Sequence, residues 1–341
     1  MSTNYSAVLE RVLNRESLSE AAAAGLMHDL ASGQLEAALA GALLAGLRAK
    51  GETADEIRGF ATAMRELALH PAIPDGPPTV DTVGTGGDGS GSLNLSTGTG
   101  LLAAASGARV VKHGNRSVSS KSGSADMLES LGMPMPLDEA ASIRCLNALN
   151  FTFLFAPAYH PAMKAIMPVR NALGVRTVFN ILGPLANPAA PPFMLVGAFS
   201  KEVAKLMADT LSGMPIERAF VVHGEPGWDE ASPAGDFFLY DVKPGTVTAS
   251  KRTPGDYGMR RCAPEDLRGG DAAHNAAELR RVLTGEDTGA HRDALVMGTS
   301  LALEVTGLAN DPMDGVGQAQ AAINEGRGSA FLEAFQAHFS S

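Results

Sequence analysis

Two polar loops rich in glycine and serine, at residues 84–97 and 112–126, constrain the fold of this chain more than any other feature. Each loop follows a short apolar run, 80–83 before the first and 108–111 before the second. Apolar runs of this length, bounded by glycine and polar residues, are typical of buried strands. The sequence therefore predicts two buried strands that each end in a polar loop without bulky side chains.

The composition of these loops favours a ligand with several phosphate oxygens. Gly84, Gly86 and Gly87 let the backbone approach a ligand closely. Ser96 lies where a helix is expected to begin, since the apolar run 101–105 follows, and a helix start carries unpaired N–H groups and a partial positive charge. Further donors come from Lys112, Arg116, Ser117, Ser119, Ser120, Lys121, Ser122 and Ser124.

Other interpretations compete with phosphate binding. The spacing Gly84-x-Gly86-x-x-Gly89 matches a dinucleotide-binding fingerprint. That fingerprint needs an acidic residue about 20 positions later, and none occurs between Asp88 and Asp126. No Gly-Lys-Ser/Thr sequence closes the loop as in a Walker motif. Either loop alone is most simply structural, whereas two loops after two strands, with one helix between them, favour a binding site.

Composition narrows the class of protein. A chain of 341 residues is long enough for two domains, and 45% hydrophobic with 5% aromatic residues is typical of a globular enzyme. The formal net charge of −10 disfavours non-specific binding to nucleic acid. Cys145 and Cys262 have no metal or redox spacing, so we expect reduced thiols. Without a leader pattern or a spanning apolar run, we expect a soluble cytoplasmic protein.

Residues 1–70 predict four amphipathic helices. Ser17-Leu-Ser-Glu20 and Thr53-Ala-Asp-Glu56 have the sequence of capping boxes, and Gly51 is expected to end the third helix. From the residues alone, the third helix could pack closely either against another helix of the same domain or against a second copy of the chain in a dimer. The small residues that permit such contact are Ala38, Gly41, Ala42, Ala45 and Gly46.

Strands alternate with helices after a proline-rich segment, 71–78, which neither a helix nor a central strand tolerates. A further buried strand is predicted at 151–155, and 237–249 predict a β-hairpin. Residues 160–188 interrupt the alternation, with two short helices expected on either side of Arg170. The alternation predicts an α/β fold with a central, mainly parallel β-sheet flanked by helices.

Two further features could bind a ligand: an acidic pair that suits a metal ion, and an arginine that suits a carboxylate. Asp229 and Glu230 lie in a loop after the apolar run 219–222, where adjacent carboxylates are either solvated surface or ligands of Mg²⁺. Arg170 is either a solvated charge or the partner of a planar carboxylate, which a guanidinium group matches with two hydrogen bonds. Six of the eight histidines show no metal-ligand spacing: His28, His70, His223, His274, His291 and His338.

The segments Gly84-Thr-Gly-Gly-Asp88, Asn94-Leu-Ser-Thr97 and Lys112-His-Gly-Asn-Arg-Ser-Val-Ser-Ser-Lys-Ser-Gly-Ser-Ala-Asp126 closely resemble the signature sequences of the anthranilate phosphoribosyltransferase family. The resemblance extends from the N-terminal helices to about Arg292. It implies transfer of the 5-phosphoribosyl group from phosphoribosyl pyrophosphate to the amine of anthranilate. The products are N-(5-phosphoribosyl)anthranilate and pyrophosphate, in the second step of tryptophan biosynthesis from chorismate.

The resemblance also implies which residues contact the two substrates. Gly84, Asn115 and Arg170 would contact anthranilate. His113 would line the substrate site. The resemblance implies catalysis by positioning and electrostatics, so no catalytic residue is assigned except His113 as a candidate. Contacts to phosphoribosyl pyrophosphate are implied for Gly84, Gly87, Asp88, Ser92, Asn94, Leu95, Ser96, Thr97, Lys112, His113, Gly114, Asn115, Arg116, Ser117, Val118, Ser119, Ser120 and Ser124.

The only cofactor that the resemblance implies is Mg²⁺, held by Ser96, Asp229 and Glu230. Trp228 departs from the smaller aliphatic residue expected beside that pair, which leaves the pose of the loop open. His160 is assigned to the site by the same resemblance.

The domain organisation implied by the resemblance is a small, discontinuous all-helical domain and a larger α/β domain of the phosphoribosyltransferase type. The helical domain comprises residues 1–73, completed by about 160–190, and the family dimerises through it. The α/β domain comprises 74–159 and 191–341 and binds phosphoribosyl pyrophosphate. Association with anthranilate synthase would be non-covalent. Two alternatives are a nucleoside phosphorylase-like enzyme, disfavoured by the acidic pair, and a non-catalytic relative that binds nucleic acid, disfavoured by the net charge.

Overall fold

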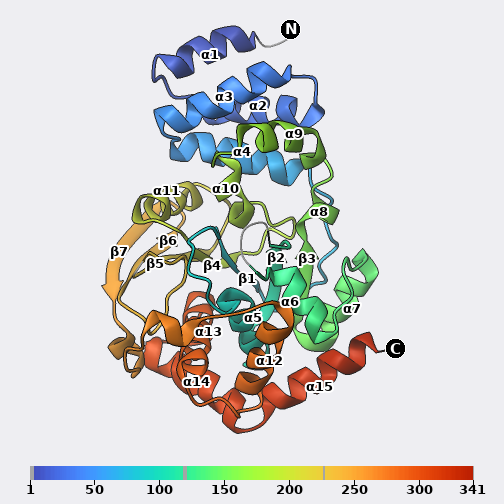
Figure 1. Ribbon diagram of the computed structural model, residues 1–341, viewed down its shortest axis with the longest axis vertical. Helices are drawn as coiled ribbons and strands as arrows, with labels where there is room; N and C mark the ends of the chain where they lie inside the picture. Colours follow the sequence, from blue (N-terminus) through green and yellow to red (C-terminus); the bar gives the residue numbers. More distant parts are fainter. Residues whose placement is uncertain (1–3, 118–120, 226, 341) are drawn as a thin grey trace.

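The computed structural model describes residues 4–117, 121–225 and 227–340. The chain forms a helical part and a larger α/β part, stacked along the long axis of the molecule (Figure 1). Val118, Ser119 and Ser120, which were predicted to contact phosphoribosyl pyrophosphate, lie outside the described residues. Within the described ranges, the helices are all too short or too polar to cross a membrane.

Four helices open the chain, as predicted. The capping box at Thr53 is present: Glu56 Oε2 accepts from Thr53 N at 2.8 Å, and Glu56 N donates to Thr53 Oγ1 at 3.3 Å. The box predicted at Ser17 is wrong, because the helix begins one residue after Ser19, whose side chain caps it instead. The four helices are α1 (Tyr5–Leu13), α2 (Glu20–Ser32), α3 (Ala37–Lys50) and α4 (Ala54–Glu66).

A single sheet of seven strands, in the order β3-β2-β1-β4-β5-β6-β7, forms the centre of the α/β part. The first five strands are mutually parallel, whereas β6 pairs antiparallel with β5 and with β7. The mainly parallel sheet and the hairpin are therefore confirmed. The strands are β1 (Thr79–Gly84), β2 (Arg109–Gly114), β3 (Phe151–Phe155), β4 (Phe193–Gly197), β5 (Arg218–Gly224), β6 (Phe237–Lys243) and β7 (Thr246–Arg252).

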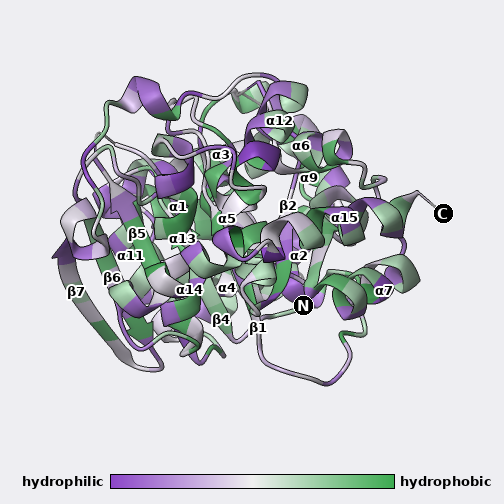
Figure 2. Cartoon of the chain, turned by 90° about the horizontal axis from the view of Figure 1, so that it is seen from below, coloured by the Kyte–Doolittle hydropathy of each residue, from purple (hydrophilic) through white to green (hydrophobic). Residues whose placement is uncertain are grey.

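Helices cover both faces of the sheet. The side chains of a strand alternate between its faces, and β4 shows this directly. Leu195 joins a core with α5, α6 and α12 to α15, whereas Met194 and Val196 join a core with α11 and the N-terminal helices. Figure 2 shows hydrophobic and hydrophilic residues on different stretches of the same helices. These helices are α5 (Leu95–Ala105), α6 (Ser124–Leu131), α7 (Glu139–Leu149), α11 (Lys201–Ser212), α12 (Ala272–Leu283), α13 (Ala290–Thr306), α14 (Pro312–Asn324) and α15 (Arg327–Phe339).

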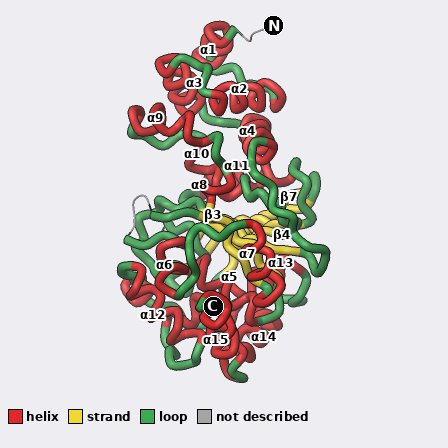
Figure 3. The backbone as a smooth tube through the Cα atoms, turned by 90° about the vertical axis from the view of Figure 1, so that its right-hand side faces the viewer, coloured by secondary structure: helices red, strands yellow, loops and turns green. Residues whose placement is uncertain are grey.

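The segment after β3 returns to the N-terminal helices. It contains α8 (Ala156–Tyr159), α9 (Met163–Leu173), α10 (Phe179–Leu182) and a short 3₁₀ turn, Gly183–Leu185. Helix α9 packs against α2 and α3 (Figures 1 and 3). The expectation of two short helices on either side of Arg170 is wrong, because α9 continues through Pro168 and contains Arg170.

The small residues of α3 serve contacts inside the helical part. A Cβ atom on Gly41 would lie 3.7 Å from Leu173 of α9, and one on Gly46 would lie 3.0 Å from Val12 of α1. Small residues let helix axes approach, so these two glycines explain how three helices pack closely. Whether α3 also forms a dimer interface stays a prediction.

Candidate functional site

The predicted binding loops meet at one edge of the sheet. The strand order reverses between β1 and β4, and in open parallel sheets ligands bind beside the carboxyl ends of strands at such a switch point. The first predicted loop follows β1, the second follows β2, and the acidic pair follows β5. Segments more than a hundred residues apart in the sequence therefore form one site.

Two glycines allow the acidic loop to lie over the end of the sheet. Gly84 of β1 and Gly197 of β4 are partners in the parallel ladder. A Cβ atom on Gly84 would lie 2.4 Å from Asp229 Oδ2, and one on Gly197 would lie 1.6 Å from the carbonyl oxygen of Asp229. Neither separation is tolerable, so both positions require glycine for this approach.

The three predicted magnesium ligands lie together. Asp229 Oδ2 accepts from Gly86 N at 2.6 Å, and Glu230 Oε1 accepts from Ser96 N at 3.1 Å. The Lys112 ammonium group donates to the carbonyl oxygen of Thr82 and, at 3.4 Å, to Ser96 Oγ. Loops after three strands thus bring two carboxylates, a hydroxyl and an ammonium group to one place.

Electrostatics in this group favour the binding of a further cation. Burial, then the charge of Asp88, raises the pKa of Asp229 to about 7, against the lowering effect of the Gly86 N–H. Burial and Asp229 raise the pKa of Glu230, and burial lowers the pKa of Lys112. The negative charges outnumber the single buried ammonium group, so a divalent cation would stabilise the ionised carboxylates.

Trp228 does not displace the acidic pair. Its side chain is buried in the core, and its backbone exchanges two hydrogen bonds with Gly224, each of 2.9 Å. The loop is therefore closed tightly at its base, with Asp229 directed toward Gly86 and Glu230 toward Ser96.

Helix α5 begins at the site, as predicted. Asn94 precedes it and holds neighbouring elements: its Nδ2 donates to the carbonyl oxygen of Ser122 at 3.0 Å, and its Oδ1 accepts from Asn275 Nδ2 at 2.8 Å. Thr97 Oγ1 donates to Ser124 Oγ at 3.0 Å, which links the starts of α5 and α6. These predicted contact residues also fix the loops to one another.

Other members of the predicted set stabilise their own loops. Arg116 pairs with Asp126 at 3.0 Å and with Glu129, and Ser117 N donates to Asp126 Oδ2 at 3.0 Å. Asn115 Oδ1 accepts from Arg116 N at 2.7 Å. A guanidinium group held by two carboxylates positions the loop more readily than it binds a phosphate.

A buried polar cluster lies behind the second loop, and its central residue was not predicted. Asp81 in β1 accepts from His113 N at 3.3 Å and from Asn187 Nδ2 at 2.8 Å. Burial raises the pKa of Asp81 to about 6, against the charge of Lys112. An aspartate inside the apolar strand 79–84 is the signal that could have revealed it, because an ionisable residue there needs partners.

His113 and His160 lie together in this cluster. Their rings pack edge to face with centroids 5.1 Å apart, and the Nε2 atoms of both are buried without a hydrogen-bond partner among the described residues. His113 Nδ1 lies 3.3 Å from the carbonyl oxygen of Gly183. Burial and then His160 lower the pKa of His113 to about 3, so this imidazole is neutral at physiological pH.

Arg170 lies apart from the strand-end loops. Its guanidinium group contacts Met167 Sδ at 3.8 Å and the ring of Phe179, 5.2 Å from the centroid. Burial lowers the pKa of Arg170, and no carboxylate in the described ranges pairs with it. The position suits an arginine that binds an acid from outside the chain.

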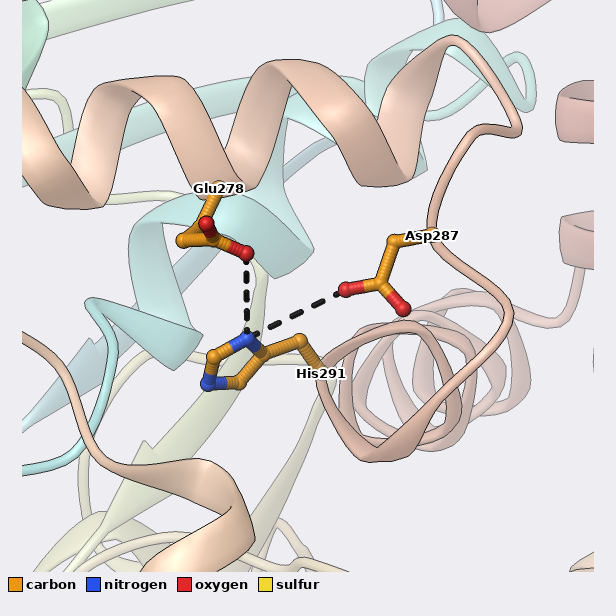
Figure 4. A group of neighbouring side chains, drawn as sticks. All are labelled: Glu278, Asp287 and His291. Carbon is orange, nitrogen blue, oxygen red and sulfur yellow. Dashed lines mark ion pairs between the residues drawn. The ribbon is translucent and has the colours of Figure 1, made fainter.

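A second group of titratable side chains lies away from these loops. Glu278 of α12 and Asp287 of the following loop face His291 of α13, with oxygen to Nδ1 distances of 3.7 and 3.9 Å (Figure 4). Sequence spacing gave no sign of this cluster. Glu278 also pairs with Arg281 at 3.1 Å, so the group is accounted for as an ion-pair network of the α12–α13 turn.

Comparisons with known proteins agree with this architecture. Residues 6–68 match a family model described as "Glycosyl transferase family, helical bundle domain", and residues 76–329 match "Glycosyl transferase family, a/b domain". The fold and the site therefore define a glycosyl transferase with a helical bundle and an α/β domain.

Individual relatives narrow the class further. The chain is 45% identical over 326 residues to the anthranilate phosphoribosyltransferase of Azorhizobium caulinodans, covering 96% of this chain and 94% of the relative. It matches the crystal structure of the Thermus thermophilus enzyme of the same name with a TM-score of 0.91 and 40% identity, over 98% and 99% of the two chains. The chain belongs to the anthranilate phosphoribosyltransferase family, and its activity is that of the family, in tryptophan biosynthesis.

Solved structures of one relative contain the ligands that the resemblance implies. The Saccharomyces cerevisiae anthranilate phosphoribosyltransferase in complex with PRPP and Mg matches with a TM-score of 0.89 and 25% identity, over 100% of this chain and 99% of the other. A second structure of that enzyme contains 4-fluoroanthranilate, with a TM-score of 0.87, 25% identity, and coverage of 98% and 97%.

Proposed function

We propose that this chain transfers the phosphoribosyl group with phosphoribosyl pyrophosphate and Mg²⁺ bound at the strand-end loops and anthranilate bound beside Arg170. One observation carries the proposal. Asp229 lies over the glycine pair 84 and 197, at the switch point of the sheet. Asp229 accepts a hydrogen bond from the first loop, and Glu230 accepts one from the start of α5.

Phosphoribosyl pyrophosphate is expected on the loops after β1 and β2 and at the start of α5. Gly87 and Asp88 belong to the first loop, Ser96 and Thr97 to the first turn of α5, and Lys112 to the end of β2. The partial positive charge of a helix start and a buried ammonium group suit the oxygens of a pyrophosphate.

The residues present fit Mg²⁺. Hard oxygen donors are the ligands that this cation prefers, and it keeps several waters, so two carboxylates and one hydroxyl suffice. Asp229, Glu230 and Ser96 would hold it, and its charge would oppose the desolvation that raises the pKa of both carboxylates. When bound, the cation stabilises negative charge on the departing pyrophosphate.

Anthranilate is expected between the loops and the returning segment. Its carboxylate would pair with the planar guanidinium group of Arg170, with Gly84 and Asn115 on the other side. This arrangement orients the amine toward C1 of the ribose, where positive charge develops as the C–O bond breaks. The chain needs no covalent nucleophile, and neutral His113 would line the site without donating a proton to the reaction.

We also infer a homodimer formed through the helical part. Large hydrophobic side chains are exposed there: Leu13 at 61%, Val175 at 52% and Met167 at 40%. Two further exposed hydrophobic side chains, Leu308 and Met313, lie in the α/β part, so the inference rests mainly on the family resemblance. Sedimentation equilibrium should give the mass of a dimer; a monomer at micromolar concentration contradicts the inference.

Association with anthranilate synthase is a separate prediction, which co-sedimentation of the two purified proteins would test.

The proposed function is tested by the fluorescence of anthranilate. The purified protein should consume anthranilate only when phosphoribosyl pyrophosphate and Mg²⁺ are both present, with one pyrophosphate released per anthranilate lost. Loss of fluorescence without Mg²⁺, or none with both present in a protein folded by circular dichroism, would contradict the proposal.

A further inference from the structure

The turn between α9 and α10 carries Arg176, to which neither the sequence nor the proposed function assigns a role. Its Nη2 atom donates to the carbonyl oxygen of Gly87 in the first loop. The same guanidinium group lies over the ring of Phe199, 4.3 Å from the centroid. A hydrogen bond and an aromatic face therefore fix this side chain in one direction, which a planar guanidinium group permits.

Both partners of Arg176 belong to the wall of the site. The residue before Gly87 donates its N–H to Asp229 Oδ2 at 2.6 Å. Phe199 N donates to Thr85 Oγ1 at 3.1 Å in the same loop. Arg176 therefore supplies a third attachment for a loop that Asp229 and the backbone of Phe199 hold from the α/β side.

The other side of Arg176 reaches the helical part. Arg48 of α3 donates from Nη1 to the carbonyl oxygen of Arg176 at 2.7 Å. The turn follows α9, whose last residues include Arg170. One short turn thus connects the helix that carries the proposed ligand of anthranilate with the loop proposed for phosphoribosyl pyrophosphate.

The surroundings favour a role in positioning over one in folding. Arg176 is exposed, so its replacement removes no buried packing. Gly87 has a φ of +72°, in the region that favours glycine, and a Cβ atom there would lie 3.4 Å from Arg176 Nη2. The conformation of the loop and the position of the guanidinium group are matched to each other.

We propose that Arg176 is a positioning residue for the transfer, which holds the loop 84–88 in its pyrophosphate-binding conformation through the carbonyl oxygen of Gly87. The inference rests on the proposed binding of phosphoribosyl pyrophosphate by this loop. Arg176 acts on the substrate through Gly87 and does not touch it.

Kinetics of three variants test the proposal. Arg176→Ala should raise KM for phosphoribosyl pyrophosphate about 10-fold, the effect of losing one hydrogen bond from a charged group, with KM for anthranilate changed less than about 2-fold. Arg176→Lys should recover part of the loss, since an ammonium group can donate to Gly87 but cannot stack flat on Phe199. Lys201→Ala is the matched control, because it removes an exposed cation 4.0 Å over the ring of Phe238.

Hydrogen exchange without substrates separates this role from direct contact. Peptides covering 84–92 should exchange faster in Arg176→Ala than in the wild type, and at the wild-type rate in Lys201→Ala. The melting temperatures of all three proteins should be equal. An active wild-type enzyme whose Arg176→Ala variant keeps its KM for phosphoribosyl pyrophosphate would overturn the inference. So would a changed KM with unchanged exchange, since that marks a direct ligand. If the wild-type protein were inactive, the proposed function would fail, and the exchange comparison would still decide whether Arg176 holds the loop.

Discussion

Asp229 shows how a single residue determines its neighbours over long distances in the sequence. Its carboxylate accepts from the N–H of Gly86, and its position excludes a side chain at Gly84 and at Gly197. Gly84 was predicted to serve close approach of a ligand, whereas no prediction was made for Gly197. In the structure, Gly84 and Gly197 serve first the close approach of the chain's own acidic loop.

Removing the charge of the acidic pair should weaken the binding of Mg²⁺. In the double variant Asp229→Asn with Glu230→Gln the shape is kept but the attraction to a cation is lost. We expect kcat/KM to fall at least about 100-fold and to recover in part at higher Mg²⁺. Glu225→Gln, an exposed carboxylate at the start of the same loop, is the control. A double variant with the Mg²⁺ dependence of the wild type would show that the pair is not a metal site.

The buried His113 should make stability depend on pH. Its pKa is lowered from 6.5 to about 3, so below pH 6.5 the unfolded chain takes up a proton that the folded protein does not bind. The free energy of unfolding should therefore fall on acidification, by up to about 1.4 kcal/mol per pH unit from this group. His113→Asn should reduce that slope between pH 6.5 and 4.5 in urea titrations, whereas His274→Asn, on the exposed side of α12, should keep it. Equal slopes in wild type and His113→Asn would contradict the assignment of His113 as neutral.

Individual site residues could be predicted where the loop sequence is specific, but their partners could not. The acidic pair, Ser96 and Lys112 lie together as expected. Asp81 was missed because its partner Asn187 is more than a hundred positions away. For Arg116 the sequence pattern predicts a basic residue in the loop, but it does not show that two carboxylates already pair with this residue.

At the scale of elements, the packing of α5 against α13 places the start of α5 at the site. The helices approach closely because glycine faces the partner on both: a Cβ atom on Gly98 would lie 2.7 Å from Leu295, and one on Gly298 would lie 2.3 Å from Thr99 Oγ1. The apolar run 101–105 predicted α5, whereas no pattern singled out α13. This contact could not be predicted, because the partners are about 200 positions apart and neither glycine lies in a turn.

Adding one methyl group to this contact should destabilise the protein. Gly298→Ala is expected to lower the free energy of unfolding by about 1–3 kcal/mol, the usual effect of overpacking a core. Gly317→Ala in α14 is the matched control, since a Cβ atom there meets nothing within 4 Å; it should stabilise by up to about 1 kcal/mol. Urea unfolding of both variants measures the difference. If Gly298→Ala left the free energy of unfolding unchanged or raised it, then α5 and α13 would not be closely packed.

At the scale of the whole molecule, we propose that two parts of the chain face the two substrates. The sheet, with its loops, could be predicted from alternating apolar runs and helices. The return of α9 to α2 and α3 could not, because its helical pattern fits either part and only the family resemblance indicated it. That return brings Arg170 and Arg176 to a second wall of the proposed site, and we propose that the two walls divide the substrates between them.

The most direct test is the pair of KM values for Arg170→Ala, with Arg170→Lys beside it. A hydrogen bond to a charged group contributes about 1.5–3 kcal/mol, so KM for anthranilate should rise about 10- to 100-fold at ~1.4 kcal/mol per decade. KM for phosphoribosyl pyrophosphate should stay within about 2-fold, and the lysine variant should recover only part, since it loses the bidentate fork. If both KM values rise equally, or neither changes, then Arg170 does not bind the anthranilate carboxylate and the two walls do not divide the substrates as proposed.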